Sequence, residues 1–424
     1  MLQRNDSIPR DAVSARIGER VRHDFVPLQL PFLAALVRMP SDNPTGDCAP
    51  HAALTADALE QIGFSVERHA VPGERVAAAG MRSVTNLVVR RRFGSGGPVV
   101  ALNAHGDVVP PGEGWTVDPY GAIVRDGVMY GRGVAVSKSD ISTYAFALRA
   151  LERCGGSLNG TVELHITYDE ECGGLLGPGW LLSEGLTRPD VVISAGFTYA
   201  VMVAHNGCLH LEVEVAGRSA HAAWPETGDD ALEAANAAMT ALYSERRRYA
   251  GTRSEIAGIG QPNLVIGTVE GGTSVNVVPD RVRFRLDRRL LPFEDPDAAE
   301  SRLRSVIADA VADYPGRSAT VRRILLARPL TPSPAQRPVV EALRRHASRI
   351  LGEPVPESGM PLFTDARLYS EAGCATVLYG AGPRVLEDAN GHRADERLVL
   401  ADLERATEVV ACALADLLAA APAP

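Results

Sequence analysis

The hydrophobic pattern of this chain changes near residue 206, and this change constrains the fold more than any other feature. From about residue 27 to 200, short apolar segments alternate with segments of helical periodicity. Strands separated by helices predict an α/β domain with a mostly parallel sheet covered by helices. The expected strands are 86–89, 98–102, 162–167 and 191–194, and the expected helices are 50–64 and 142–151.

Beyond residue 206 the apolar residues recur with period two, as in strands that have one solvated face. This pattern predicts strands at 209–215, 263–269, 281–286 and 320–324, and helices at 230–247 and 296–312. The order strand, helix, two strands, helix, strand predicts a small α+β domain whose open sheet face offers an oligomer contact. Because mixed patterns resume near 326, this domain is expected to be an insertion. The predicted divisions are 1–205, 206–325 and 326–424.

Length and composition set the broad class. A chain of 424 residues exceeds what one core usually supports. The net charge of −9 argues against nucleic acid and anionic membranes as partners. Six scattered cysteines without a Cys-x-x-Cys pair fit a reducing compartment. No signal-peptide h-region and no run of 18 apolar residues is present, so we expect a cytoplasmic protein without a membrane span.

A His-x-Asp pair follows the apolar run 98–102. His105 is therefore expected at or just past a strand end, where α/β sheets place ligand-binding groups. Asp107 can accept a hydrogen bond from one imidazole nitrogen, which leaves the other nitrogen as an oriented metal ligand. A lone pair of this kind is also common in solvated loops, so the interpretation depends on what accompanies it.

Two later segments supply matching groups. Asp169, Glu170 and Glu171 follow the strand 162–166, and three consecutive carboxylates repel one another. A cation would relieve the repulsion, with one glutamate binding it and its neighbour acting as a general base. An exposed acidic turn is the alternative. The second segment, 389–396, is a polar loop with His392, which by itself would suit a surface histidine.

Together these segments resemble the di-zinc amidohydrolase and exopeptidase family, which includes acetylornithine deacetylase, succinyl-diaminopimelate desuccinylase, aminoacylase and bacterial glutamate carboxypeptidase. The similarity runs in order from about residue 30 to 418. The matching segments include HGDVVP at 105–110, GRG at 131–133, DEE at 169–171, GRSAHAAWPETGDDALEA at 217–234, GGTSVNVVPD at 271–280, DRR at 287–289, TDAR at 364–367 and GHRADE at 391–396. The resemblance implies a zinc-binding α/β domain interrupted by a ferredoxin-like lid or dimerisation domain.

The resemblance also implies a role for each matching residue of the larger domain. His105 resembles the first-site zinc ligand, with Asp107 as its supporting partner. Glu170 resembles the general base that takes a proton from metal-bound water. Glu171 and His392 resemble ligands of the second site.

In the inserted domain, His221 resembles the histidine that enters the active site of the partner protomer and stabilises the oxyanion. Asn276 and Arg289 resemble groups that hold the substrate, Arg289 by gripping its carboxylate. The resemblance therefore implies a homodimer that acts on a small molecule.

Two expected metal ligands are missing. The family has an aspartate that bridges both metals two residues before the position of Lys138, and here that position is Val136. Another first-site carboxylate of the family falls on Gly196. Neither valine nor glycine has a side chain that can coordinate a cation.

Three explanations remain open at this stage. In the first, Asp140 replaces the bridging ligand, because residues four apart share a helix face if the helix has already begun. A capping box with Ser137 at a helix start is the other interpretation of Asp140. In the second, His105, Glu171 and His392 hold a single metal. In the third, the site binds no metal.

The metal-free alternative predicts a carbon–nitrogen lyase or a small-molecule binding protein on the same scaffold, with Glu170, His105 and His221 free for acid–base chemistry. We expect instead a metal-dependent hydrolase of amide bonds in small N-acyl amino acids or dipeptide-like compounds. The expected cofactor is one or two divalent ions per protomer, zinc in preference to cobalt or manganese.

Overall fold

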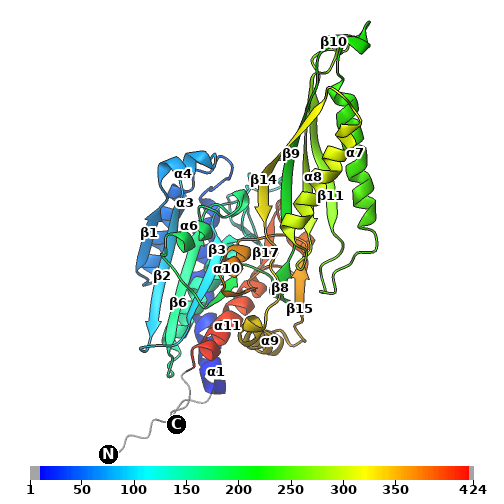
Figure 1. Cartoon of the computed structure of the whole chain (residues 1–424). Helices are drawn as coiled ribbons and strands as arrows, with labels where there is room; N and C mark the ends of the chain where they lie inside the picture. The colour runs from blue at the N-terminus through cyan, green and yellow to red at the C-terminus, as the bar shows by residue number, and fades with distance from the viewer. Residues whose placement is uncertain (1–9, 420–424) are drawn as a thin grey trace, which may run out of the picture. The chain divides into compact units, whose positions relative to one another are not determined.

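The computed structural model describes residues 10–419 and divides the chain into two compact units (Figure 1). The larger unit extends to Val203 and also contains Ser333–Ser358 and the chain from Thr364 onward. The smaller unit consists of Ala204–Pro332 and Gly359–Phe363. Within residues 10–419, no helix is long and apolar enough to cross a lipid bilayer.

An eight-stranded sheet forms the centre of the larger unit, in the order β1-β2-β6-β3-β7-β16-β8-β15. The neighbours β6, β3, β7 and β16 run parallel, whereas β1, β2 and β6 pair antiparallel at one side. The strand bounds are β1 (Val66–Ala70), β2 (Thr85–Phe93), β3 (Val99–His105), β6 (Gly160–Thr167), β7 (Val191–Ser194), β8 (Val201–His205), β15 (Glu357–Met360) and β16 (Ala375–Leu378). The predicted α/β class with a largely parallel central sheet is confirmed.

Helices pack around this sheet. The helices are α1 (Arg10–Asp24), α2 (Leu30–Arg38), α3 (Ala49–Gln61), α4 (Gly73–Ala78), α5 (Lys138–Arg153), α6 (Pro178–Ser183), α9 (Arg337–Leu351), α10 (Ala366–Glu371) and α11 (Leu400–Leu417). A small sheet, β17-β5-β4, combines β4 (Ile123–Arg125), β5 (Val128–Tyr130) and β17 (Arg397–Val399). The core lies where β3 and β6 pack against α5, which in turn packs against α11. β3 is apolar from Val99 to Leu102, as expected of a strand buried on both faces. Along β6, in contrast, apolar and polar side chains alternate, and the polar Glu163, His165 and Thr167 are buried as well.

The smaller unit has the predicted order of elements. It contains β9 (Gly207–Ala216), β10 (Ala220–His221), α7 (Ala231–Arg248), β11 (Asn263–Gly271), β12 (Val277–Val278), β13 (Arg281–Leu290), α8 (Pro296–Ala312) and β14 (Ser318–Ala327). The four long strands pair antiparallel in the order β11-β13-β9-β14, and β10 pairs with β12. This strand order and the two helices give the ferredoxin-like arrangement that the sequence resemblance implied.

Alternation along β9 separates the two faces of the small sheet. Leu209, Leu211, Val213 and Val215 are fully buried and belong to the core shared with α7 and α8. The intervening side chains lie on the opposite face. On that face Glu212 accepts hydrogen bonds from arginines of both neighbouring strands, β13 and β14. The open face of this sheet is therefore charged.

Candidate metal centre

Parallel pairing of β3 with β6 brings the two predicted ligand segments together. His105, the last residue of β3, is in register with Thr167, the last residue of β6. The segment Asp169–Glu171 follows at once, and Glu170 and Glu171 begin a short 3₁₀ turn. Both strands run in the same direction, so the two segments that follow them leave the sheet side by side, at the position where α/β folds bind ligands.

Asp107 organises this edge. Its carboxylate is fully buried and accepts hydrogen bonds from the backbone N–H groups of Glu170 (3.3 Å) and Glu171 (3.2 Å) and from Nδ2 of Asn43 (3.0 Å). His105 Nδ1 donates to the backbone carbonyl of Asp107 at 2.9 Å, whereas the nearer carboxylate oxygen lies at 3.4 Å. From the sequence, the carboxylate was expected to orient the imidazole. In the structure the carbonyl is the closer acceptor, and the carboxylate positions the two glutamates.

His105, Glu170 and Glu171 form one of two groups within residues 10–419 that offer at least three closely spaced metal-ligand atoms. Their ligand atoms lie within 4.8 Å of one another. Nε2 of His105, the nitrogen not used by Asp107, lies 3.9 Å from Oε2 of Glu170. The donors therefore converge as a cation site requires, and their chemistry suits a divalent ion such as zinc.

His392 approaches the same group from the loop that precedes β17. Its Nε2 lies 3.3 Å from Oε1 of Glu171, and 52 % of its side chain is exposed. The buried Glu396 anchors this loop, because its carboxylate accepts hydrogen bonds from Arg132 and from the backbone N–H groups of Ala135 and Val136. The GRG and GHRADE segments are thus tied to each other beside the metal-ligand group.

The carboxylates of the group outnumber its one cationic side chain, His105, and the pKa values of Glu170 and His105 reflect this imbalance. Burial raises the pKa of Glu170 to about 8; His105 opposes this shift, and Glu171 and Asp107 add to it. Burial alone would lower the pKa of His105, but Glu170, Asp107 and Glu171 hold it well above its usual value. Neighbouring carboxylates in a dry site favour a bound proton, and a cation in that place would favour the ionised form.

Asp140 lies in the first turn of α5, which begins only at Lys138. Val136 precedes this helix, so the helical spacing that would place both residues on one face does not apply. The capping-box alternative is wrong as well, because Ser137 makes no side-chain cap hydrogen bond. Oδ1 of Asp140 instead accepts a hydrogen bond from the N–H of Ala381 at 2.8 Å, and Asp140 lies outside the three-residue group.

Positions 136 and 196 differ in what they could accommodate. The Val136 side chain is half-buried and lies near Gly391, the residue before His392. A Cβ at Gly196 would come within 2.7 Å of the backbone N of Tyr379 and 2.9 Å of the carbonyl carbon of Leu378. Backbone packing therefore leaves no room for a carboxylate side chain at position 196. Position 136 already carries a side chain, and only the type of that side chain differs from the family.

Two further carboxylates belong to this neighbourhood and were not assigned from the sequence. Asp169 and Asp365 are buried, and each has a carboxylate oxygen without a hydrogen-bond partner. Burial raises the pKa of Asp365 to about 8, and the charge of Glu170 adds to the shift. Asp169 is the first residue of the DEE triplet, and Asp365 lies in the TDAR segment that the resemblance had included without a role. Three consecutive acidic residues give no sign in the sequence of which side chain is buried.

The remaining predicted residues lie in the smaller unit, at opposite ends of its sheet. His221 and Asn276 are exposed neighbours, because β10 pairs with β12 and the N–H of Ala222 donates to the carbonyl of Asn276. Arg289 is near the far end of β13, where its Nε donates to Oδ1 of Asp287 at 2.9 Å. Figure 1 shows β10 at the tip of the smaller unit.

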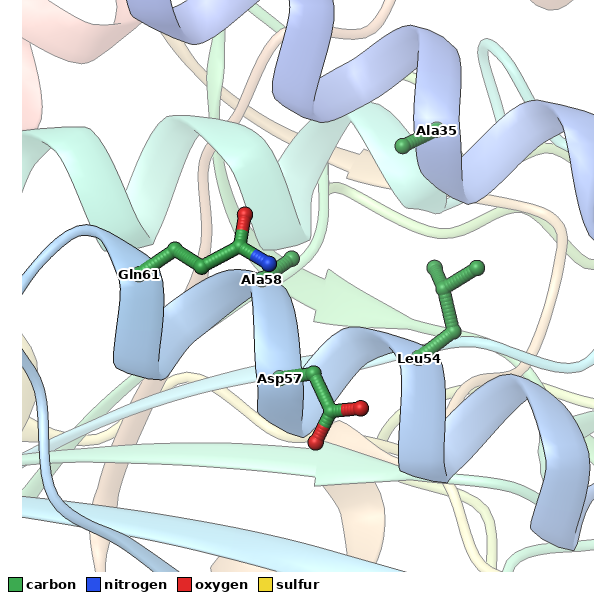
Figure 2. Close-up of a pocket in the computed structure, with 5 residues that line it drawn as sticks. All are labelled: Ala35, Leu54, Asp57, Ala58 and Gln61. Atoms are coloured by element: carbon green, nitrogen blue, oxygen red, sulfur yellow. The ribbon is translucent and has the colours of Figure 1, made fainter.

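A separate hollow of about 410 Å³ lies between α2 and α3, lined by Ala35, Leu54, Asp57, Ala58 and Gln61 (Figure 2). Its one acidic group, Asp57, pairs with the exposed Arg68. None of the predicted site residues lines this hollow, so it is not the candidate centre.

Residues 101–416 match the family model described as Peptidase family M20/M25/M40. The chain belongs to this family. Succinyl-diaminopimelate desuccinylase of Rhizorhabdus wittichii is 30% identical over 386 residues, which cover 88% of this chain and 94% of that protein. The M20 chain is thus a hydrolase, as the sequence resemblance predicted, and the lyase and binding-protein alternatives gain no support.

Two solved structures share the fold of this M20 chain. The dipeptidase Dug1p of Saccharomyces cerevisiae has a TM-score of 0.74 at 14% identity and covers 95% of this chain and 98% of its own. The YXEP protein of Bacillus subtilis, a dinuclear metal-binding peptidase of family M20, has a TM-score of 0.67 at 17% identity, covering 94% and 99%.

Proposed function

We propose that this M20 protein hydrolyses the amide bond of small N-acyl amino acids or dipeptide-like compounds with the help of a divalent cation, zinc being the expected ion. The observation that carries the proposal is the convergence of His105, Glu170 and Glu171 on the buried Asp107. The succinyl-amino-acid and dipeptide activities in the names of its relatives support this substrate class.

The proposed ligands are His105, Glu171 and His392, with Glu170 left as the general base. A bound divalent cation would polarise the scissile carbonyl and the attacking water, and would favour the ionised form of the neighbouring carboxylates. Glu170 would take the proton of the attacking water and return it to the leaving amine. Asp107 would hold the backbone of both glutamates in place through its two N–H contacts.

Because Val136 and Gly196 stand where the family places carboxylates, the proposal is for one tightly held ion in this centre. Asp140 stays a weaker candidate ligand, because one of its oxygens already accepts from Ala381. A set of two histidines, one glutamate and a separate glutamate base is sufficient for metal-assisted hydrolysis in other folds.

The geometry of the smaller unit supports a homodimer as the working form. Arg281 and Arg289 lie eight residues apart on β13, which corresponds to roughly 27 Å along an antiparallel strand. His221 and Asn276 lie beyond the Arg281 end, since the N–H of Gly217 donates to the carbonyl of Asp280. One small substrate therefore cannot touch both His221 and Arg289 of the same unit. If both act, as we propose, one of them comes from the partner subunit.

We further propose that the protein is cytoplasmic. None of the six cysteines forms a disulfide, which agrees with a reducing compartment. The acidic balance of the sequence supports small molecules as its ligands in preference to nucleic acid.

The decisive test is hydrolysis by the purified protein after loading with zinc, cobalt or manganese. A panel of N-succinyl and N-acetyl amino acids and dipeptides is offered, and release of the free amine is measured. We expect amine release that a chelator abolishes, with one oxygen from ¹⁸O-labelled water in the carboxylate product. Release of a carboxamide in place of the free amine would show elimination across the Cα–N bond, and no amine release from any substrate by the metal-loaded protein would contradict the proposal.

A further inference from the structure

The second group of closely spaced metal-ligand atoms within residues 10–419 lies entirely in the smaller unit. It consists of Cys208, His210 and Asp287. His210 and Asp287 face each other across β9 and β13, and Cys208 lies two residues before His210, on the same face of the sheet. The register of two antiparallel strands thus places a thiol, an imidazole and a carboxylate together on the open face of the small sheet.

The three ligand atoms form a compact triangle. Sγ of Cys208 lies 3.1 Å from Nε2 of His210 and 3.4 Å from Oδ2 of Asp287. Nε2 of His210 lies 2.8 Å from the same Oδ2. In a nucleophilic triad, the carboxylate and the nucleophile would contact different nitrogens of the imidazole. Here both contact Nε2, so the arrangement converges on a point and does not form a proton relay.

We propose that Cys208, His210 and Asp287 bind a zinc ion, as a site separate from the catalytic centre. Thiolate, imidazole and carboxylate are the three side-chain ligands that zinc prefers. With Zn–S of about 2.3 Å and Zn–N and Zn–O of about 2.0–2.1 Å, tetrahedral coordination needs ligand separations of roughly 3.3–3.5 Å. Each of the three separations between ligand atoms therefore needs to increase by only about 0.1–0.5 Å for the ion to fit.

Burial and charge around the triangle are compatible with this ion. Cys208 is fully buried, whereas the side chains of His210 and Asp287 are 34 % and 28 % exposed, so solvent reaches one side of the group. Water can then supply the fourth ligand. Arg289 donates to Oδ1 of Asp287 and leaves Oδ2 to the ion. Burial alone would raise the pKa of Asp287, but His210 and Arg289 outweigh it and bring the pKa to about 2, so this ligand is ionised.

Binding replaces the proton of the Cys208 thiol with the metal and releases that proton to solvent, because only the thiolate coordinates. The bound ion would fix Asp287 and, through it, the guanidinium of Arg289. A side chain that hydrogen-bonds to a metal ligand holds that ligand in place, and the metal-bound ligand in turn fixes the side chain. The site therefore couples zinc occupancy to the orientation of an arginine proposed to hold substrate. The zinc site itself does not depend on the proposed reaction.

Cobalt substitution tests the site directly. Co²⁺ bound to a thiolate gives a sulfur-to-metal charge-transfer absorption, which a site with only nitrogen and oxygen ligands lacks. We expect the full-length protein to show this band once both proposed centres are loaded, with about two equivalents of Co²⁺, and to lose it when zinc is added. The band should disappear in Cys208→Ala. In His210→Gln, Co²⁺ should bind at least about tenfold more weakly, since loss of even an outer partner costs that much.

Cys172 provides the matched control. It follows Glu171, and its Sγ contacts Asn43 at 3.1 Å, so it is the cysteine beside the catalytic centre. Cys172→Ala and the ligand variant Glu171→Ala should both retain the band. Absence of the band in the Co²⁺-loaded wild type, or its persistence in Cys208→Ala, would overturn the proposal. Circular dichroism confirms that each variant is folded, and His210→Gln provides the test if Cys208→Ala does not fold.

Discussion

The two ligand groups of this molecule are built in opposite ways. In the larger unit, His105 ends one parallel strand, and Glu170 and Glu171 follow the end of its neighbour. Burial, with the charge of Glu171 beside it, raises the pKa of Glu170 to about 8. In the smaller unit, antiparallel register sets Asp287 opposite His210, and Arg289 lies two residues further along the same strand. Against the effect of burial, these two side chains lower the pKa of Asp287 to about 2. A carboxyl group whose pKa is raised like that of Glu170 can exchange a proton near neutral pH, as a general base must. A compensated carboxylate suits a permanent ligand.

Replacing Glu170 by glutamine tests this contrast with the largest expected effect. The amide cannot accept the proton of the attacking water, so kcat should fall by about 10²–10⁴. Metal content of the larger unit should stay near that of the wild type, because Glu170 is proposed as a base and not as a ligand. Steady-state kinetics and elemental analysis of the same preparation measure both. A fully active Glu170→Gln enzyme would remove this residue from the mechanism.

The next largest effect concerns His221. Loss of a donor placed at the oxyanion costs about 2.7–4 kcal/mol, or roughly 10²–10³ in kcat. We therefore expect His221→Ala to be nearly inactive. Mixing it with inactive Glu170→Gln subunits should restore part of the activity, because a heterodimer holds one site with an intact Glu170 and an intact His221.

Subunit exchange must be shown independently, for example with two affinity tags. If mixed dimers form and no turnover returns, His221 serves its own protomer or has no catalytic role. As a matched control, His221→Ala subunits mixed with Glu170→Gln/His221→Ala subunits should show no recovery, because no intact His221 remains in that mixture. A recovery specific to His221 would support a site shared between protomers.

The sequence predicted the elements around the site better than the contacts within it. Period-two alternation placed β9 and β13 correctly, and an apolar run found β3, because burial on one face or on both leaves a pattern along the chain. Contacts between distant segments leave no such pattern. Asp107 was therefore paired with the imidazole of His105, whereas its carboxylate holds the backbone of two glutamates. The inward turn of Asp365 was missed for the same reason.

The departures at 136 and 196 illustrate this limit further. Both look alike in the sequence, as a ligand replaced by an apolar residue, but only position 196 is closed by backbone packing. Gly196→Asp should lower the free energy of unfolding by about 1–3 kcal/mol or more, as overpacking does. Val136→Asp, at a half-buried position, should cost much less. Denaturant titration of both variants checks the difference, and equal destabilisation would contradict the packing argument.

The smallest expected effect is a change of one ion in the metal count. Because the proposed Cys208 site contributes its own ion, the count for the catalytic centre is made in the Cys208→Ala variant, where we expect about one tightly held divalent ion per protomer. Adding Val136→Asp to this variant should raise the count toward two, since it returns a carboxylate beside the His392 loop. Two tightly held ions without that change would contradict the single-ion proposal. Asp140→Ala would then decide the matter, because loss of one ion would identify Asp140 as the substitute ligand despite its contact with Ala381.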